Sequence, residues 1–201
     1  MEHVQQLKKD KKLATLINEP YHELTTHKNI ALRLMASIMS QQLNTKVARV
    51  IQKRFFELYD GKEPTPQEVL NTPAEALRSI GLSNAKVNYV HNVAAFCIEH
   101  KMTDKKLLAL GNEEVIELLT QIKGVGRWSV EMLLMFTLGR EDLFAVDDLG
   151  LQNAMIKLYK IKETDKKAIR ERLLKISSKW SPYRTYACLY LWGWKDGEGP
   201  V

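Results

Sequence analysis

Apolar residues recur along the chain at intervals of three and four, which is the spacing of one face of an α-helix. Ile30, Leu34 and Ile38 show the pattern clearly. The same spacing recurs at Val47, Val50, Ile51 and Phe55, at Val87, Val90 and Val93, and at Leu173 and Ile176. Strict alternation of apolar and polar residues, the pattern of a strand, does not run to a useful length. The sequence therefore predicts an all-α fold of about ten short helices.

Hydroxyl residues followed by proline mark several helix starts. A threonine or serine side chain can accept the first N–H groups of a helix, and proline fits its first position. Thr65-Pro-Gln-Glu68 and Thr72-Pro-Ala-Glu75 add the glutamate of a capping box, and Ser181-Pro182 repeats the first half of the device. We expect a single helical domain over residues 1–201 with two lobes around a cleft. The middle lobe would span roughly 30–130, with the N- and C-terminal helices in the other.

The composition is that of a globular protein with a moderate excess of positive charge. Thirty lysines and arginines oppose 24 acidic residues, and the formal net charge of +6 favours a polyanionic partner such as DNA or RNA. The two cysteines, Cys97 and Cys188, fall in apolar helical patterns and are expected to be buried. They are too few for a four-cysteine cluster. No signal-peptide core or membrane-length apolar run occurs, so we expect an intracellular protein with no membrane partner.

A short turn with two glycines, Ile122-Lys-Gly-Val-Gly-Arg127, separates helical patterns near 112–121 and 127–138. Without Cβ atoms, Gly124 and Gly126 let backbone N–H groups approach an anion closely. The helix that follows presents its positive end to the same place, and Lys123 and Arg127 add charge. The turn therefore predicts a phosphate site. An ordinary connection between two helices, with glycine at a helix end, has the same outline.

Two adjacent carboxylates, Asp147 and Asp148, stand directly before the helical run that begins at Leu149. One of them is expected to cap that helix, and a structural cap is the simpler interpretation. Beside a bound phosphate, a carboxylate can also stabilise positive charge that develops during a reaction. On residue type alone, both roles stay open.

Aromatic residues and a polar loop each have a structural and a functional interpretation. Aromatic side chains at helical spacing are typical of a core, but a protein that handles an extruded base needs aromatic faces to stack on it. Met39-Ser-Gln-Gln-Leu-Asn44 interrupts two helical patterns, as a plain turn does. Its functional interpretation is a loop tip that enters a base stack, with Gln42 or Leu43 as the plug. The aromatic candidates are Trp128, Trp192, Trp194, Tyr183, Tyr186 and Tyr190.

Five segments taken in order carry a family resemblance. They are Ser40-Gln-Gln-Leu43, Ile80-Gly-Leu-Ser-Asn-Ala-Lys86, Gly124-Val-Gly-Arg-Trp-Ser-Val-Glu-Met132, Asp142-Leu-Phe-Ala-Val-Asp-Asp-Leu-Gly150 and Ser181-Pro-Tyr-Arg-Thr-Tyr-Ala-Cys-Leu-Tyr-Leu-Trp192. Together they resemble the helix-hairpin-helix DNA glycosylase superfamily, and within it the 3-methyladenine DNA glycosylase II type, which repairs alkylated bases. The resemblance covers roughly residues 28–195. It implies the fold of that superfamily and a partner of double-stranded DNA containing damaged bases. It also implies action in the cytoplasm or nucleoid of a prokaryote or in the nucleus of a eukaryote.

The resemblance assigns roles by position. The catalytic aspartate of the family falls on Asp148, and Asp147 falls in the base pocket. A shift of the match by one residue would exchange these two roles. Trp128 and Trp192 match positions that stack on the damaged base. Met132 falls where some relatives have an aromatic side chain, so the pocket wall here is softer. The residues matched to DNA contacts are Gln41, Gln42, Leu43, Lys123, Gly124, Val125, Gly126 and Arg127.

One difference within the superfamily bears on the reaction. Bifunctional members, which also cut the strand, place a lysine right after the hairpin, where this chain has Trp128. Because tryptophan cannot form a Schiff base, we expect a hydrolase, a DNA N-glycosylase without lyase activity. We also expect that its chemistry uses no cofactor and no metal. A monomer is expected. Three alternatives stay open: a non-enzymatic helix-hairpin-helix DNA-binding protein, a glycosylase for other damaged bases, and a helical partner-binding module.

Overall fold

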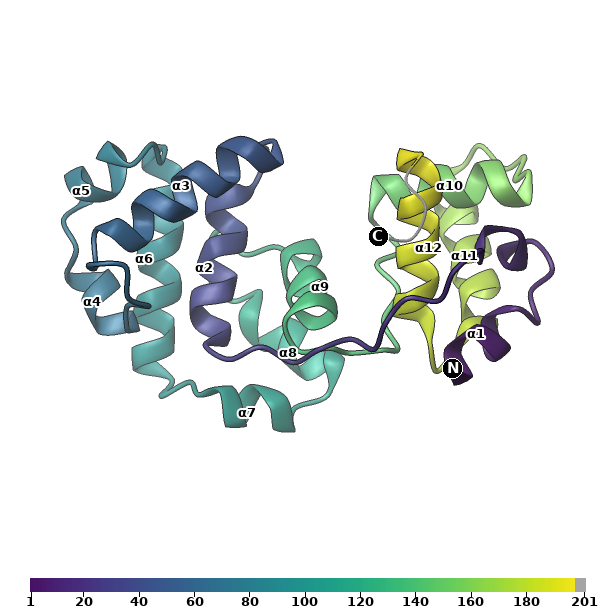
Figure 1. The fold of residues 1–201 in the computed structure, drawn as a ribbon, viewed down its shortest axis with the longest axis horizontal. Helices are drawn as coiled ribbons and strands as arrows, with labels where there is room; N and C mark the ends of the chain where they lie inside the picture. Colours follow the sequence, from purple (N-terminus) through teal and green to yellow (C-terminus); the bar gives the residue numbers. More distant parts are fainter. Residues whose placement is uncertain (198–201) are drawn as a thin grey trace. The chain divides into compact units, whose positions relative to one another are not determined.

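The computed structural model describes residues 1–197, and within them it holds twelve α-helices, two short 3-10 helices and no strand (Figure 1). The predicted all-α fold is confirmed. The chain divides into two compact units, which we call the middle unit, Thr26–Leu138, and the terminal unit, Met1–Thr25 with Gly139–Val201. Within the described residues, no helix has both the length and the apolar character needed to cross a membrane.

The middle unit is built around two helices, α2 and α6, which pack against each other. α2 also packs against α3 and α9, and α6 packs against α4 and α5. Its core includes Ile30, Leu34 and Ile38, the residues whose spacing predicted the first of these helices, and all three are fully buried. The helices are α2 (Ile30–Ser40), α3 (Thr45–Glu57), α4 (Pro66–Asn71), α5 (Ala74–Ser79), α6 (Asn84–Glu99), α7 (Asp104–Ala109), α8 (Asn112–Leu119) and α9 (Arg127–Phe136).

The terminal unit joins the two ends of the chain in one helical core. α10 packs against α12, and α12 also contacts both 3-10 helices. Trp180 is fully buried at the centre, with its ring edge-on to Phe144 at a centroid distance of 5.8 Å. His3 from the first helix stacks on the ring of Tyr186 at 4.0 Å, which fixes the N-terminus against α12. The elements are α1 (Glu2–Leu7), η1 (Leu13–Leu16), α10 (Leu149–Tyr159), α11 (Lys166–Ser177), η2 (Ser178–Trp180) and α12 (Arg184–Asp196).

Of the three predicted proline-associated caps, one is confirmed and two are wrong. Thr65 caps α4 with a complete capping box. Thr72 instead ends that helix, because its hydroxyl donates to the Glu68 carbonyl, and α5 begins after Pro73 without a side-chain cap. Ser181 lies outside α12, because its hydroxyl donates to the Asp142 carboxylate at 2.8 Å and the helix begins at Arg184. In both cases a partner outside the expected helix takes the hydroxyl.

The two cysteines are buried, as expected from their apolar surroundings. Cys97 lies on the inner face of α6 and Cys188 on that of α12. Burial raises the pKa of the Cys97 thiol to about 12, since a thiolate there would lose its hydration. Cys97 is therefore a core residue without nucleophilic character.

Candidate functional site

The turn between α8 and α9 is a tight hairpin whose shape depends on Gly124. This residue has φ of +101°, a conformation that side chains with Cβ rarely adopt. A Cβ added there would lie 2.8 Å from the Cβ of Tyr89 on α6 and would overlap its ring. Gly126 differs, because it has an extended conformation and a Cβ there would meet no atom within 4 Å. Gly124 thus shapes the turn, while Gly126 keeps its outer surface open.

The hairpin presents the start of α9 in a form suited to an anion. Gly126 is the N-cap, and no side-chain hydrogen bond caps the helix there. The first backbone N–H groups and the positive end of the helix dipole therefore face outward together. Lys123 is exposed beside them, and its carbonyl accepts a hydrogen bond from Asn92 of α6, which fixes the turn. Val125, between the glycines, is buried and anchors the turn from below.

Arg127 has carboxylate partners that the sequence analysis did not foresee. Its guanidinium binds both oxygens of Glu113 on α8, at 2.8 and 3.1 Å, and its Nε donates to Glu131 at 3.0 Å. The hydrogen bonds that Arg127 donates to the Glu113 carboxylate are the main reason that the pKa of Arg127 is raised. The residue therefore braces the two helices of the hairpin. Its predicted contact with DNA stays a prediction.

The loop between α2 and α3 is held tightly although its tip is exposed. Lys86 of α6 reaches under the loop and donates to the carbonyls of Met39 and Gln41, at 2.9 and 2.8 Å. The Gln41 side chain donates to the Ser129 hydroxyl on α9 at 3.2 Å. Burial lowers the pKa of Lys86. Gln42 stands at the tip with φ of +59°, an unusual conformation for a residue with a side chain, and such backbone outliers cluster at functional sites.

The same loop and α9 enclose an open pocket of about 570 Å³ within the middle unit. Trp128 and Met132, one turn apart on α9, form one wall, and Gln41, Gln42 and Leu43 form the other. The Trp128 side chain is 45% exposed, which is high for such a large apolar group. Five of the predicted site residues therefore meet in one pocket, and Trp128 gives that pocket an aromatic side chain.

In the terminal unit, Asp148 is the N-cap of α10, as one of the two aspartates was expected to be. Its Oδ1 accepts the N–H of Leu151 at 2.8 Å and the indole N–H of Trp192 at 3.1 Å. The carboxylate is half-buried, so it remains accessible. Trp192 thus has an observed role in orienting Asp148, in addition to the stacking role that was predicted for it.

Asp147 has a different environment from its neighbour. It is exposed, and it forms an ion pair with Arg170 of α11 at 3.0 Å. An exposed pair of this kind contributes little to stability, but it turns the carboxylate toward α11. Asp148 is therefore the better placed of the two for chemistry, because its orientation is fixed by two N–H donors.

Lys195 is a residue near Asp148 that the sequence analysis missed. A Cβ added to Gly150 would lie 3.0 Å from Asp148 Oδ1, 3.3 Å from Lys195 Nζ and 3.5 Å from Trp192 Nε1. These three groups therefore converge over Gly150, which leaves room for them because it has no side chain. The match of Gly150 to the family segment indicated that this position matters, but nothing in the sequence placed Lys195 beside it.

The remaining aromatic candidates are core residues or lie elsewhere. Tyr186 and Tyr190 are buried in the terminal unit, in keeping with the structural interpretation. Trp194 lies under Lys157, whose ammonium group is 5.1 Å from the ring centroid. In residues 1–197, no group of three or more His, Cys, Asp or Glu side chains is placed to hold a metal ion.

Comparison with known proteins assigns the chain to a family. The chain matches the HhH-GPD superfamily of base excision DNA repair proteins over residues 35–179, and it belongs to that superfamily. The resemblance inferred from the sequence is therefore confirmed.

Its relatives include named 3-methyladenine DNA glycosylases. The chain is 38% identical to DNA-3-methyladenine glycosylase 1 of Schizosaccharomyces pombe over 87% of its own length and 72% of that protein. The structure is similar to that of the S. pombe 3-methyladenine DNA glycosylase in complex with abasic DNA, with TM-score 0.81, 34% identity and 96% of each chain covered. A DNA-3-methyladenine glycosidase from Bacillus halodurans gives TM-score 0.83 and 35% identity, over 97% of this chain and 89% of that one. These relatives support the predicted function, an alkylbase glycosylase of base excision repair.

Proposed function

We propose that this protein binds duplex DNA, extrudes a damaged nucleotide and hydrolyses the N-glycosidic bond of alkylated purines such as 3-methyladenine. The observation that carries the proposal is the carboxylate of Asp148, oriented by the N–H groups of Leu151 and Trp192 at the start of α10. Membership of a base excision repair superfamily supports the reaction class. The names of the relatives support the choice of substrate.

DNA binding in this proposal depends on the hairpin. The exposed N–H groups at the start of α9 and the side chain of Lys123 take backbone phosphates, independently of sequence. The net charge of +6 adds a general attraction. Gly126 matters because any side chain there would stand where the phosphate approaches. A measurable consequence is weaker binding with rising salt.

Extrusion of the base requires a plug and a stacking surface. The exposed tip at Gln42, with Leu43 beside it, fills the space left in the duplex. Trp128 and Trp192 remain the candidates for stacking on a base, and a purine that carries positive charge from alkylation is attracted to electron-rich aromatic faces. Met132 gives a polarisable, adaptable side to the pocket.

The chemistry needs one carboxylate. A cationic alkylated purine is already a good leaving group, so its departure requires no strong general acid. As the bond breaks, the sugar gains oxocarbenium character, which Asp148 stabilises while it orients or deprotonates the attacking water. We propose no lyase step, because the position after the hairpin is Trp128, which cannot form a Schiff base.

Borohydride trapping tests the absence of lyase chemistry. We expect no covalent adduct between the protein and DNA under conditions in which base release is complete. Lys195 lies near Asp148 and is the nearest candidate for an unexpected Schiff base. An adduct that survives in Lys195→Gln would point to another amine, and any adduct at all contradicts a purely hydrolytic reaction.

Base release tests the function itself. The protein is incubated with duplexes that each carry one defined lesion: a methylated purine, hypoxanthine, ethenoadenine or oxidised guanine. Free base is then measured by chromatography. We expect release of methylated purines. Binding without release of any base would favour the non-enzymatic alternative, and preferential release of oxidised guanine would favour a different substrate class.

Two further parts of the proposal concern the working form of the protein. One DNA-binding hairpin per chain fits a monomer, in which both units act as one glycosylase domain over residues 1–201. Sedimentation with and without DNA measures this directly. The protein would act where the chromosomal DNA lies, and a fluorescent fusion would show co-localisation with the DNA stain.

A further inference from the structure

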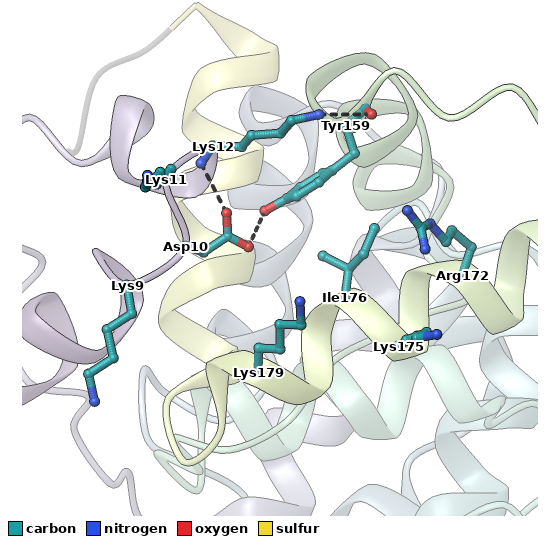
Figure 2. Close-up of a pocket in the computed structure, with 9 residues that line it drawn as sticks. All are labelled: Lys9, Asp10, Lys11, Lys12, Tyr159, Arg172, Lys175, Ile176 and Lys179. Carbon is teal, nitrogen blue, oxygen red and sulfur yellow. Dashed lines mark hydrogen bonds between the residues drawn. The ribbon is translucent and has the colours of Figure 1, made fainter.

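A second pocket, of about 600 Å³, lies in the terminal unit and is strongly basic (Figure 2). Five lysines and one arginine line it, against a single aspartate, Asp10. Its cations come from two segments far apart in sequence. Lys9, Lys11 and Lys12 follow α1, while Arg172, Lys175 and Lys179 stand at helical spacing on one face of α11 and its continuation.

The cations that point into this pocket are poorly neutralised. Lys11, Arg172, Lys175 and Lys179 are exposed, and within residues 1–197 none of their side chains donates a hydrogen bond to the protein or forms an ion pair with it. Lys175 of α11 and Lys179 of η2 line the same pocket, so their like charges repel each other. An anion bound among these side chains would remove that repulsion.

Asp10 offsets only one of the pocket's six positive charges, and its carboxylate oxygens also hold the fold together. It accepts hydrogen bonds from the Tyr159 hydroxyl at 2.7 Å and the Trp180 indole at 3.1 Å. It also accepts the backbone N–H groups of Lys12 and Leu13, at 3.0 and 3.2 Å. These bonds tie the basic segment to α10 and to the core. Figure 2 shows Asp10 beside Lys12 and Tyr159, with a hydrogen bond to each.

The pocket also has a firm wall. Lys12 Nζ donates to the Tyr159 carbonyl at 3.0 Å and lies 5.3 Å from the centroid of that ring. Ile176 is buried beneath the pocket floor. The basic side chains therefore project from a fixed surface rather than from a loose terminal segment, which reduces the entropy that binding must overcome.

This pocket is separate from the candidate catalytic carboxylate. Asp148 caps the first residue of α10, whereas Tyr159 is the last of its 11 residues. At about 1.5 Å per residue, roughly 16 Å of helix separates them. A duplex advances about 3.4 Å per base pair along each strand, so this distance corresponds to about five base pairs.

We infer that this basic pocket binds phosphates of the DNA backbone outside the lesion. The inference rests on the proposed function, because it takes DNA as the polyanion that the protein meets. Ammonium and guanidinium groups recognise phosphate without reading a base, and the lining offers no set of acceptors suited to a base edge. The phosphates come either from the flank of the same duplex or from a second duplex.

Two double variants test the site. Lys175→Gln/Lys179→Gln removes two charges from the pocket, and Lys166→Gln/Lys167→Gln removes two from the opposite end of the same helix. All four lysines are exposed, so both proteins should fold. Equal thermal unfolding temperatures and equal base release from a duplex with short flanks would establish that the variants are comparable.

Fluorescence anisotropy then separates the two sources. In one arm, abasic duplexes with short and long flanks are compared. In the other, protein saturated with unlabelled short abasic duplex is titrated with labelled lesion-free duplex. In at least one arm we expect the pocket variant to bind more weakly than wild type, with a log–log salt slope smaller by roughly two, while the control variant stays near wild type.

The outcomes are decisive. If the pocket variant loses affinity only for the abasic duplex with long flanks, the phosphates belong to the same duplex. If it loses affinity only in the second titration, they belong to another duplex. Equal behaviour of the two variants in both arms overturns the inference. The inference is also overturned if wild type binds a poly-glutamate peptide more tightly than DNA and the pocket variant loses that peptide binding. The pocket would then serve an acidic protein partner. Failure of wild type to release any base would overturn the proposed function alone.

Discussion

Replacing Gly124 by alanine should destabilise the middle unit, whereas the same change at Gly126 should not. At Gly124, the left-handed backbone costs a residue with Cβ roughly 1–2 kcal/mol. The new methyl group also overlaps the Tyr89 ring, and overpacking of this kind adds about 1–3 kcal/mol. We therefore expect a loss of about 2–5 kcal/mol, equivalent to a fall in Tm of about 4–20 °C for a chain of this size.

Gly126→Ala is the matched control. Its Cβ meets no atom within 4 Å and its backbone is extended, so stability should stay within about 1 kcal/mol of wild type. Any weakening of DNA binding by this variant then reports the approach of phosphate to the turn, and it should be equal for all DNA sequences.

Thermal unfolding followed by circular dichroism measures both variants. Adding Tyr89→Ala to Gly124→Ala should recover only the part of the loss that comes from the Tyr89 ring, because alanine keeps the Cβ that lies 2.8 Å from the new methyl group. If Gly124→Ala unfolds at the wild-type temperature, the argument from the shape of the hairpin is wrong. A large loss of stability in Gly126→Ala would be equally damaging.

Three other predictions follow from single contacts. Trp192→Phe keeps a stacking ring but removes a hydrogen bond to the Asp148 carboxylate worth about 1.5–3 kcal/mol, so single-turnover excision should slow roughly 10- to 100-fold with little change in DNA affinity. Lys86→Met removes two hydrogen bonds to loop carbonyls, including that of Gln41. Because the loop is proposed to help extrude the base, the rate of excision should fall more for a well-paired lesion in duplex DNA than for one in a single strand. For Asp10, burial raises the pKa but its hydrogen bonds outweigh this, so the pKa in the folded protein lies below the ordinary value of 3.8. The stabilisation from Asp10 is present above about pH 4 and is lost as the pH falls through the folded pKa. The Tm difference between wild type and Asp10→Asn should therefore shrink as the pH is lowered below about 4, and a constant difference would exclude this linkage.

Periodicity was sufficient to predict the fold class because most of the regularly spaced apolar residues are buried, although Val47 and Val50 of α3 are exposed. Ile30, Leu34 and Ile38 lie on the buried face of α2, where their spacing places them. The start of that helix could not be predicted in the same way. Its N-terminal amides, at Asn29 and Ile30, are capped by the Asp104 carboxylate from α7, which is 74 and 75 residues distant in sequence.

The same limit applies to hydroxyl residues before proline. Thr65 caps a helix locally, and this was predictable because its partners are within three residues. Ser181 binds Asp142 instead, and that contact exists only because the tertiary fold brings the two segments together. Local capping patterns therefore compete with distant partners that the sequence does not place.

The candidate site also has a part that the sequence predicted and a part that only the structure shows. The order of the motifs identified the hairpin, the loop and the aspartate pair. The structure added the partners: Glu113 on Arg127, Lys86 beneath the loop, and Lys195 near Asp148. Each of these joins elements that are separate in sequence, so spacing along one helix carried no information about them.

The central claim is that Asp148 acts on the sugar from which the base departs. Its most direct test is the single-turnover rate of base release by Asp148→Asn on DNA with a methylated purine, with Asp147→Asn as the adjacent control. We expect release to fall by orders of magnitude in Asp148→Asn while DNA affinity persists, and to fall far less in Asp147→Asn, whose carboxylate pairs with Arg170. Near-normal release by Asp148→Asn would contradict the account.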